Sequence, residues 1–126
     1  MGLNKQLSLA DIIKAEDHRD EKVPTPEWGE GTFITIRSMT GEARDAYEMT
    51  LFNMAGDGEY KQDLSNARAK MIAACAIGPD GKRMFTSEDH IKALGSKNNV
   101  VIDRIWKACQ KLNAIGDAQI DELLGN

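Results

Sequence analysis

The chain has 126 residues, which is enough for one domain whose core needs no metal or disulfide. Hydrophobic residues make up 41% and charged residues 29%, as in a globular rather than a disordered protein. The net charge of −4 argues against a nucleic-acid partner, because phosphate binding depends on clustered Lys and Arg. No apolar run approaches the roughly 20 residues of a membrane span, and the N-terminus lacks a signal-peptide pattern. We therefore expect a cytoplasmic protein without a membrane partner.

The first residues have the features of a charged arm. Ser8 is followed three residues later by Asp11, the spacing of a capping box, and Leu9, Ile12 and Ile13 follow at helical intervals. A helix of two to three turns is predicted here, before a charged stretch without periodicity. Residues 1–22 are therefore interpreted as an acidic, partly flexible N-terminal arm that contains one short helix.

A β-hairpin is predicted next. Residues Val23–Trp28 and Thr32–Met39 flank the turn Gly29-Glu30-Gly31, and the second run alternates and is rich in β-branched residues. The first strand should lie at a sheet edge, because its two prolines lack the N–H groups that a ladder needs. The strand Thr32–Met39 would then have an open side for self-association, by pairing across subunits.

Four helices are predicted after the hairpin. Thr40 caps the first, which should run to Met54 before Gly56-Asp57-Gly58. The second starts near Leu64 and stops at Gly78-Pro79. A capping box of Thr86 and Asp89 opens the third, which closes at Gly95, and Ser96 caps the longest helix, with its core-facing residues at Val101, Ile105, Ala108 and Leu112. The fold class is mainly α (α+β): a helical domain of about four helices with an N-terminal β-hairpin at 23–116, and a short amphipathic tail at 117–126.

The residues that usually carry chemistry do not form a recognisable site. The two histidines, His18 and His90, lack partners at metal-ligand spacing, and His90 is expected on a helix surface. Cys75 and Cys109 lie in apolar helical patterns, so we expect buried, reduced thiols, with a disulfide between facing helices as the alternative. We predict no catalytic residue, no cofactor and no metal, and hence a protein that is not an enzyme.

The candidate functional residues are instead apolar side chains that a partner could bind. Trp28 stands beside glycine at the hairpin turn, where a Trp is often exposed. The two ends of the chain each carry a short amphipathic segment. These candidates are Leu9, Ile12, Ile13, Trp28, Ile120, Leu123 and Leu124. The alternative for the two end segments is that they dock on their own domain.

Three stretches, taken in order, resemble the tail assembly chaperones of long-tailed phages (siphophages) and related prophages. The first is Val23–Arg37, with Trp28-Gly29 and the strand Phe-Ile-Thr-Ile-Arg, followed by 39–45. The second is Arg68–Ile77, which runs into the turn Asp80-Gly81-Lys82. The third comprises Ala93-Leu94-Gly95, the segment 101–105 and the closing pair Leu112-Asn113. The resemblance covers about residues 20 to 115 and rests on the joint order of the stretches.

This resemblance implies a chaperone that binds the tape measure protein, keeps it soluble and helps to recruit tail tube protein. Such a protein would act in the host cytoplasm and be absent from the finished virion. Two alternatives remain open on the residues alone: a structural tail completion or connector protein, and a small helical adaptor unrelated to phage.

The resemblance also implies ribosomal frameshifting near the end of the reading frame. Leu124-Gly125-Asn126 can be encoded by codons that contain the slippery heptamer G-GGA-AAC. The alternative is that Gly125 and Asn126 are an ordinary frayed helix end.

Overall fold

The computed structural model describes residues 2–54, 58, 60–62 and 64–115. Its elements form an α+β fold with four helices after an N-terminal hairpin, which confirms the predicted fold class. In chain order they are α1 (Leu9–Lys14), β1 (Asp20–Pro24), the 3-10 helix η1 (Pro26–Trp28), β2 (Phe33–Arg37), α2 (Gly41–Met49), β3 (Phe52–Met54), β4 (Tyr60–Gln62), α3 (Ala67–Cys75), β5 (Ala76–Ile77), α4 (Glu88–Gly95) and α5 (Asn99–Leu112).

The main sheet has three antiparallel strands in the order β1-β2-β5. Val23 pairs with Ile34 in the hairpin, and Thr35 pairs with Ile77 of β5. The hairpin and the edge position of its first strand are as predicted, but that strand spans Asp20–Pro24 instead of Val23–Trp28. The reason is Pro26, whose fixed φ suits the first position of the η1 turn.

The open edge predicted for the Thr32–Met39 strand is not present along its centre. The strand β2 is flanked by β1 on one side and, at Thr35 and Ile36, by β5 on the other. A two-residue strand such as β5 has too little pattern to be predicted from sequence.

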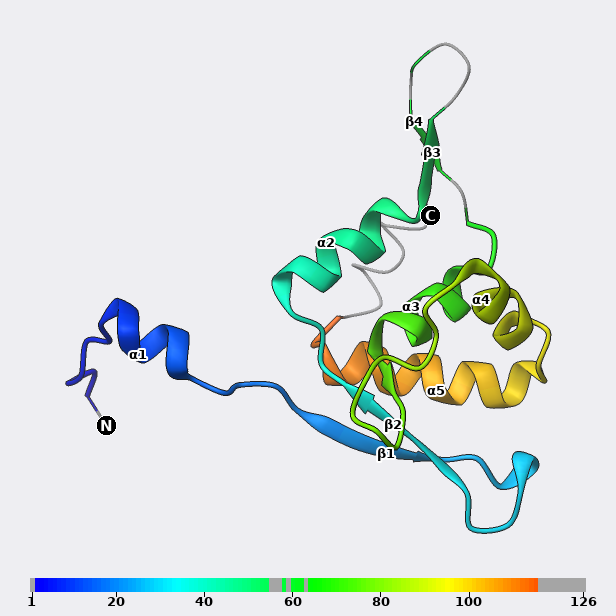
Figure 1. Cartoon of the computed structure of the whole chain (residues 1–126), viewed down its shortest axis with the longest axis horizontal. Helices are drawn as coiled ribbons and strands as arrows, with labels where there is room; N and C mark the ends of the chain where they lie inside the picture. The colour runs from blue at the N-terminus through cyan, green and yellow to red at the C-terminus, as the bar shows by residue number, and fades with distance from the viewer. Residues whose placement is uncertain (1, 55–57, 59, 63, 116–126) are drawn as a thin grey trace.

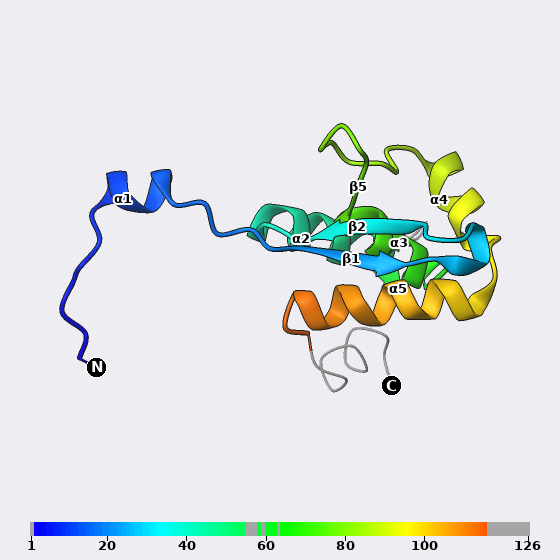
Figure 2. The ribbon, with the colours of Figure 1, turned by 90° about the horizontal axis from the view of Figure 1, so that it is seen from below.

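The core lies between one face of the hairpin and helices α3 and α5 (Figures 1 and 2). Val101 and Ile105 are fully buried as predicted, whereas Ala108 and Leu112 are half-buried. Burying each large aliphatic side chain contributes about 1.5–3 kcal/mol. The fully buried aliphatic residues that join the elements are Ile36, Leu51, Met71, Ile72, Val101 and Ile105.

Helix α2 is shorter than predicted. Thr40 caps it as expected, since its hydroxyl accepts the Ala43 N–H at 3.0 Å. The helix ends at Met49 rather than Met54, and Phe52–Met54 forms the strand β3, which pairs with β4. Leu51 is fully buried at the point where the chain leaves the helix, and strand pairing then satisfies the backbone groups that follow.

The caps of the last two helices differ by one or two residues from the prediction. The hydroxyl of Ser87, not Thr86, accepts the His90 N–H and caps α4. Asn98, not Ser96, caps α5 through its side-chain oxygen, which accepts the Val100 N–H at 2.8 Å. Ser96 instead ends α4. Helix α3 begins at Ala67, so Leu64 precedes it and is exposed.

The N-terminal arm extends away from the body, and α1 stands apart from it (Figures 1 and 2). The predicted capping box is present, because Ser8 and Asp11 bond reciprocally between side chain and backbone. Backbone pairing with β2 starts where Ser38 donates to the Arg19 carbonyl at 2.8 Å, so the last residues of the predicted 1–22 arm belong to the sheet. The predicted tail 117–126 lies outside the described residues.

Candidate functional site

Neither histidine belongs to a cluster of metal-binding side chains in the described residues. His18 is exposed in the arm, and His90 lies on the surface of α4 as predicted, where its Nδ1 accepts the Thr86 N–H at 3.1 Å. Within residues 2–54, 58, 60–62 and 64–115, no three His, Cys, Asp or Glu side chains converge as metal ligands.

The two cysteines face each other across the interface of α3 and α5. Both are buried and free, which confirms the prediction of buried thiols. The Cys75 sulfur also accepts a bond from Asn113 Nδ2 at 3.5 Å. The hydrogen bond with Cys75, together with burial, raises the pKa of the Cys109 thiol. The same bond lowers the pKa of the Cys75 thiol. Both sulfurs are enclosed in the core, so burial limits the access of a reactant to either one.

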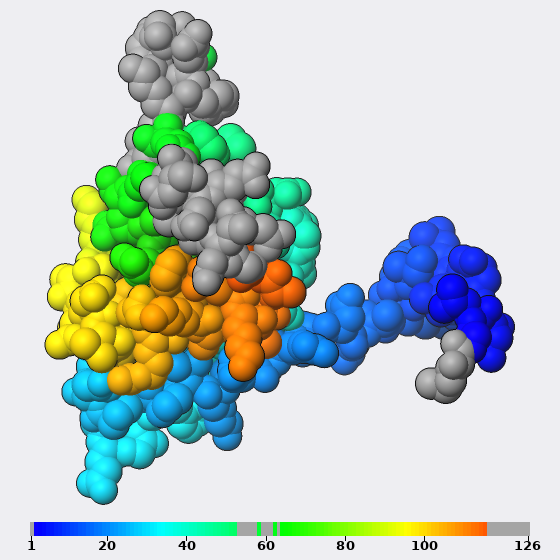
Figure 3. Space-filling model, turned by 180° about the vertical axis from the view of Figure 1, so that it is seen from behind, coloured from blue at the N-terminus to red at the C-terminus, as the bar shows by residue number. Residues whose placement is uncertain are grey.

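Within the described residues, one face of α1 is an exposed apolar cluster. Leu9 is 74% exposed, Ile12 59% and Ile13 74%, and no residue of α1 is buried. The space-filling view shows the arm connected to the body only through the chain that leads into β1 (Figure 3). We call this set of three residues the α1 apolar face. A large apolar cluster without cover on an extended arm is a feature of partner-binding segments.

The other predicted candidates lie elsewhere. Trp28 is 38% exposed at the end of η1, in the connection between β1 and β2, whereas the arm enters the sheet at the opposite end of β1. The structure therefore does not bring it together with the α1 apolar face. The C-terminal candidates Ile120, Leu123 and Leu124 lie outside the described residues.

Sequence reasoning missed a second apolar surface, on the sheet face that α5 does not cover. The exposed or half-buried members of the strands, Lys22, Phe33, Thr35 and Ile77, form its floor, and the loop after β5 stands over it (Figure 2). The groove between floor and loop has a volume of about 440 Å³. We call it the sheet groove and define it by Lys22, Phe33, Thr35, Ile77, Pro79 and Met84.

The strand alternation could have revealed this groove. Ile34 and Ile36 point into the core, so Phe33 and Thr35, which alternate with them along the strand, must point outward. Phe33 is a large apolar residue on that outward face and remains 51% exposed. The part supplied by Met84 could not be predicted, because it depends on how the loop after β5 folds back.

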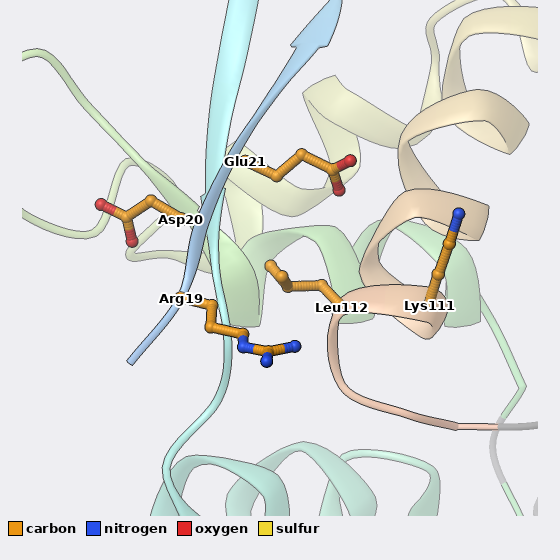
Figure 4. A pocket seen from close by; sticks show the side chains of 5 residues that line it. All are labelled: Arg19, Asp20, Glu21, Lys111 and Leu112. Carbon is orange, nitrogen blue, oxygen red and sulfur yellow. The ribbon is translucent and has the colours of Figure 1, made fainter. Parts of the chain in front are cut away.

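A second hollow, of about 430 Å³, lies between the start of β1 and the end of α5. Figure 4 shows Arg19 and Glu21 directed toward α5, where Lys111 and Leu112 complete the lining. Asp20 points the other way, and its carboxylate binds the Arg37 guanidinium at 2.8 Å. The hollow thus has charges of both signs and a single apolar side chain, which does not define one class of ligand.

No helix in the described residues is long and apolar enough to cross a membrane. Comparison of the chain with models of protein families, with curated proteins and with solved structures found no significant match.

Proposed function

We propose that this chain is a phage tail assembly chaperone. It binds the tape measure protein in the host cytoplasm, keeps it soluble and helps to recruit tail tube subunits, and it is not retained in the virion. The observation that carries the proposal is the α1 apolar face, which is presented on an arm outside the folded body. The resemblance of three ordered sequence stretches to that family supports this choice of function.

The dimensions of α1 suit a contact that must later be released. Complete burial of one Leu or Ile gains about 1.5–3 kcal/mol, but a six-residue helix is marginal by itself and must be ordered on binding. Each arm therefore binds weakly. Many arms along one long partner chain would act together through multivalency, and the growing tail tube could displace them one by one.

Co-expression with the tape measure protein tests this function. The tape measure gene is expected beside the gene for this chain, and the measured quantity is the soluble fraction of its product. The double variant Leu9→Asp, Ile13→Asp should lower that fraction to the level without chaperone. Val100→Asp changes an apolar residue that is 61% exposed on α5, and it serves as the matched control that should retain solubilisation. Equal solubilisation by both variants would exclude the arm as the binding element.

Purified virions separate the chaperone from a connector protein. Mass spectrometry of the particles should not detect the chain if it is a chaperone, whereas a tail completion or connector subunit would be present in a fixed ratio.

The proposed frameshift is tested on the gene. Codons for Leu124–Asn126 that break the slippery heptamer would exclude slippage at this point.

A further inference from the structure

In the described part of the chain, the first strand of the main sheet has a neighbouring strand on one side only. Strand β1 is the outer member of the order β1-β2-β5, and it pairs with β2. We propose that the outer side of β1 binds an extended, acidic segment of another protein, which pairs antiparallel with it as a further strand. This surface is separate from the α1 apolar face, and the inference does not rest on the proposed function.

The backbone of β1 directs alternate residues toward its outer side. The Thr25 N–H donates to the Thr32 carbonyl at 3.0 Å, so Thr25 and every second residue before it bond toward β2. Asp20 and Lys22 lie between those residues, and their N–H and C=O groups therefore face outward. We call these four backbone groups the β1 edge. They are the donors and acceptors that a further strand needs.

The β1 edge is open, although the same side of the strand is closed at its other end. There, Arg104 Nη1 donates to the Pro24 carbonyl at 3.1 Å, so α5 covers the strand. Asp20 and Lys22 are both exposed, and the hollow of about 430 Å³, lined in part by Leu112, separates the start of β1 from the end of α5 (Figure 4). The hollow alone defines no ligand, but it leaves room beside the β1 edge for the side chains of an added strand.

The charges around the β1 edge favour an acidic strand. Asp20 is compensated, because its carboxylate binds the Arg37 guanidinium at 2.8 Å. The other charged side chains of the hollow and of the strand beside it are three cations and one carboxylate: Arg19, Lys22, Lys111 and Glu21. This basic surface belongs to a chain whose net charge is −4. Backbone pairing accepts many sequences, so charge complementarity decides which strand fits.

Pairing between the β1 edges of two copies is disfavoured by charge. In a two-fold antiparallel pair that uses these backbone groups, the axis passes through Asp20, Glu21 or Lys22. Each of these registers places one charged residue opposite its own copy, and like charges directly opposite each other destabilise a sheet. The occupant is therefore a different chain.

Fluorescence anisotropy of a labelled heptapeptide, in which Glu and Val alternate, tests the binding. The peptide should bind the full chain saturably, and the same peptide with Lys in place of Glu should bind at least about ten times more weakly. Lys22→Glu should weaken binding about five-fold or more, because it places like charges opposite each other.

Two control proteins locate the site. Lys92→Glu makes the same charge change at an exposed position of α4 and should bind the peptide normally. So should the double variant Leu9→Asp, Ile13→Asp, because the α1 apolar face takes no part in this contact. Absence of saturable binding, or equal weakening by both lysine variants, would overturn the proposal.

Methylation of the peptide's backbone nitrogens tests the strand pairing. In an antiparallel pair, Lys22 exchanges both hydrogen bonds with the residue directly opposite, whose side chain lies on the same face and should be acidic. N-methyl groups on the Glu residues should therefore abolish binding, whereas N-methyl groups on the Val residues should leave it nearly unchanged. Equal effects of the two peptides would contradict the pairing. Sedimentation that shows a dimer of the chain, dissociated by the peptide, would assign the β1 edge to a second copy and would also overturn the proposal.

Discussion

Arg104 on α5 binds the carboxylate of Glu27 with both arms of its guanidinium. Nη1 donates to Oε1 at 2.8 Å and Nη2 to Oε2 at 2.6 Å, across a sequence separation of 77 residues. Nη1 also donates to the Pro24 carbonyl at 3.1 Å. The η1 turn, which ends at Trp28, is thus fixed to the longest helix by a two-point contact, whose planar geometry Arg provides and Lys does not.

This pair should make stability depend on pH. The hydrogen bonds from Arg104 lower the pKa of Glu27 from its ordinary 4.5 to about 2. A carboxyl whose pKa is depressed in the folded state contributes stability above its unfolded pKa, and the contribution is lost as the pH falls through the folded value. We expect Glu27→Gln to lower the thermal midpoint at pH 7, and the gap to the unchanged chain should close between pH 4.5 and about 2.

Thermal unfolding of both proteins at several pH values measures that gap. The comparison isolates Glu27 from Asp20, whose pKa is also lowered, in that case by its bond to Arg37. A difference in thermal midpoint that stays constant down to pH 2 would mean that Glu27 stabilises the fold by packing and not by its charge.

Asn113, the C-cap of α5, connects that helix with the chain between β2 and α2, and it should be sensitive to substitution. Its Oδ1 accepts the Met39 N–H at 2.7 Å, and its Nδ2 donates to the Cys109 carbonyl at 2.8 Å. Asn113→Ala leaves the Met39 N–H without this acceptor, so the free energy of unfolding should fall by about 1–3 kcal/mol. Asn113→Asp keeps the acceptor but faces the Cys109 carbonyl with a carboxylate, and it should recover stability when acid protonates that group.

Urea denaturation at pH 7 and pH 4 measures both variants. The exposed Asn99 lies on the same helix and provides the control, Asn99→Ala, which should stay within about 0.5 kcal/mol of the unchanged chain.

The two native thiols should be protected from modification until the protein unfolds. Cys75 and Cys109 are 1% and 0% exposed, and a raised pKa at Cys109 further suppresses its thiolate. Labelling with an aromatic disulfide reagent should therefore follow the fraction of open molecules. A Ser96→Cys variant places a thiol at an exposed position and should react immediately. Rapid labelling of both native thiols without denaturant would show that α3 and α5 separate in the native state.

The helix caps and the buried side of the longest helix can be predicted from the sequence, because neighbouring residues determine them. Ser8 with Asp11 and Thr40 with Ala43 satisfy backbone N–H groups within one turn, so they need no tertiary context. Val101 and Ile105 belong to a long helix, whose period repeats enough times to identify its buried side.

The sequence does not predict those elements whose ends are set by contacts between residues far apart in the chain. Leu51 has helical spacing from Tyr47, yet its burial ends α2 and the pairing of Phe52 with Gln62 starts a hairpin instead. The sheet groove likewise depends on Ile77, which pairs with Thr35 after 41 intervening residues. Three-residue and two-residue strands have no readable period, so only the folded chain identifies them.

The cap of α1 should control the function of the arm without affecting the body. Ser8 Oγ accepts the Asp11 N–H at 3.2 Å, and the Ser8 N–H donates to the Asp11 carboxylate and lowers its pKa. Ser8→Ala should destabilise the short helix by about 1 kcal/mol, which is enough to fray a helix of this length. Because no residue of α1 is buried, the thermal midpoint of the body should not change. Amide exchange at residues 9–14 should accelerate, and solubilisation of the tape measure protein should weaken in parallel.

Ser96→Ala, at the end of α4, is the matched control. A Ser8→Ala chain that exchanges faster in α1 but solubilises as well as before would show that the partner binds the arm without needing its helix.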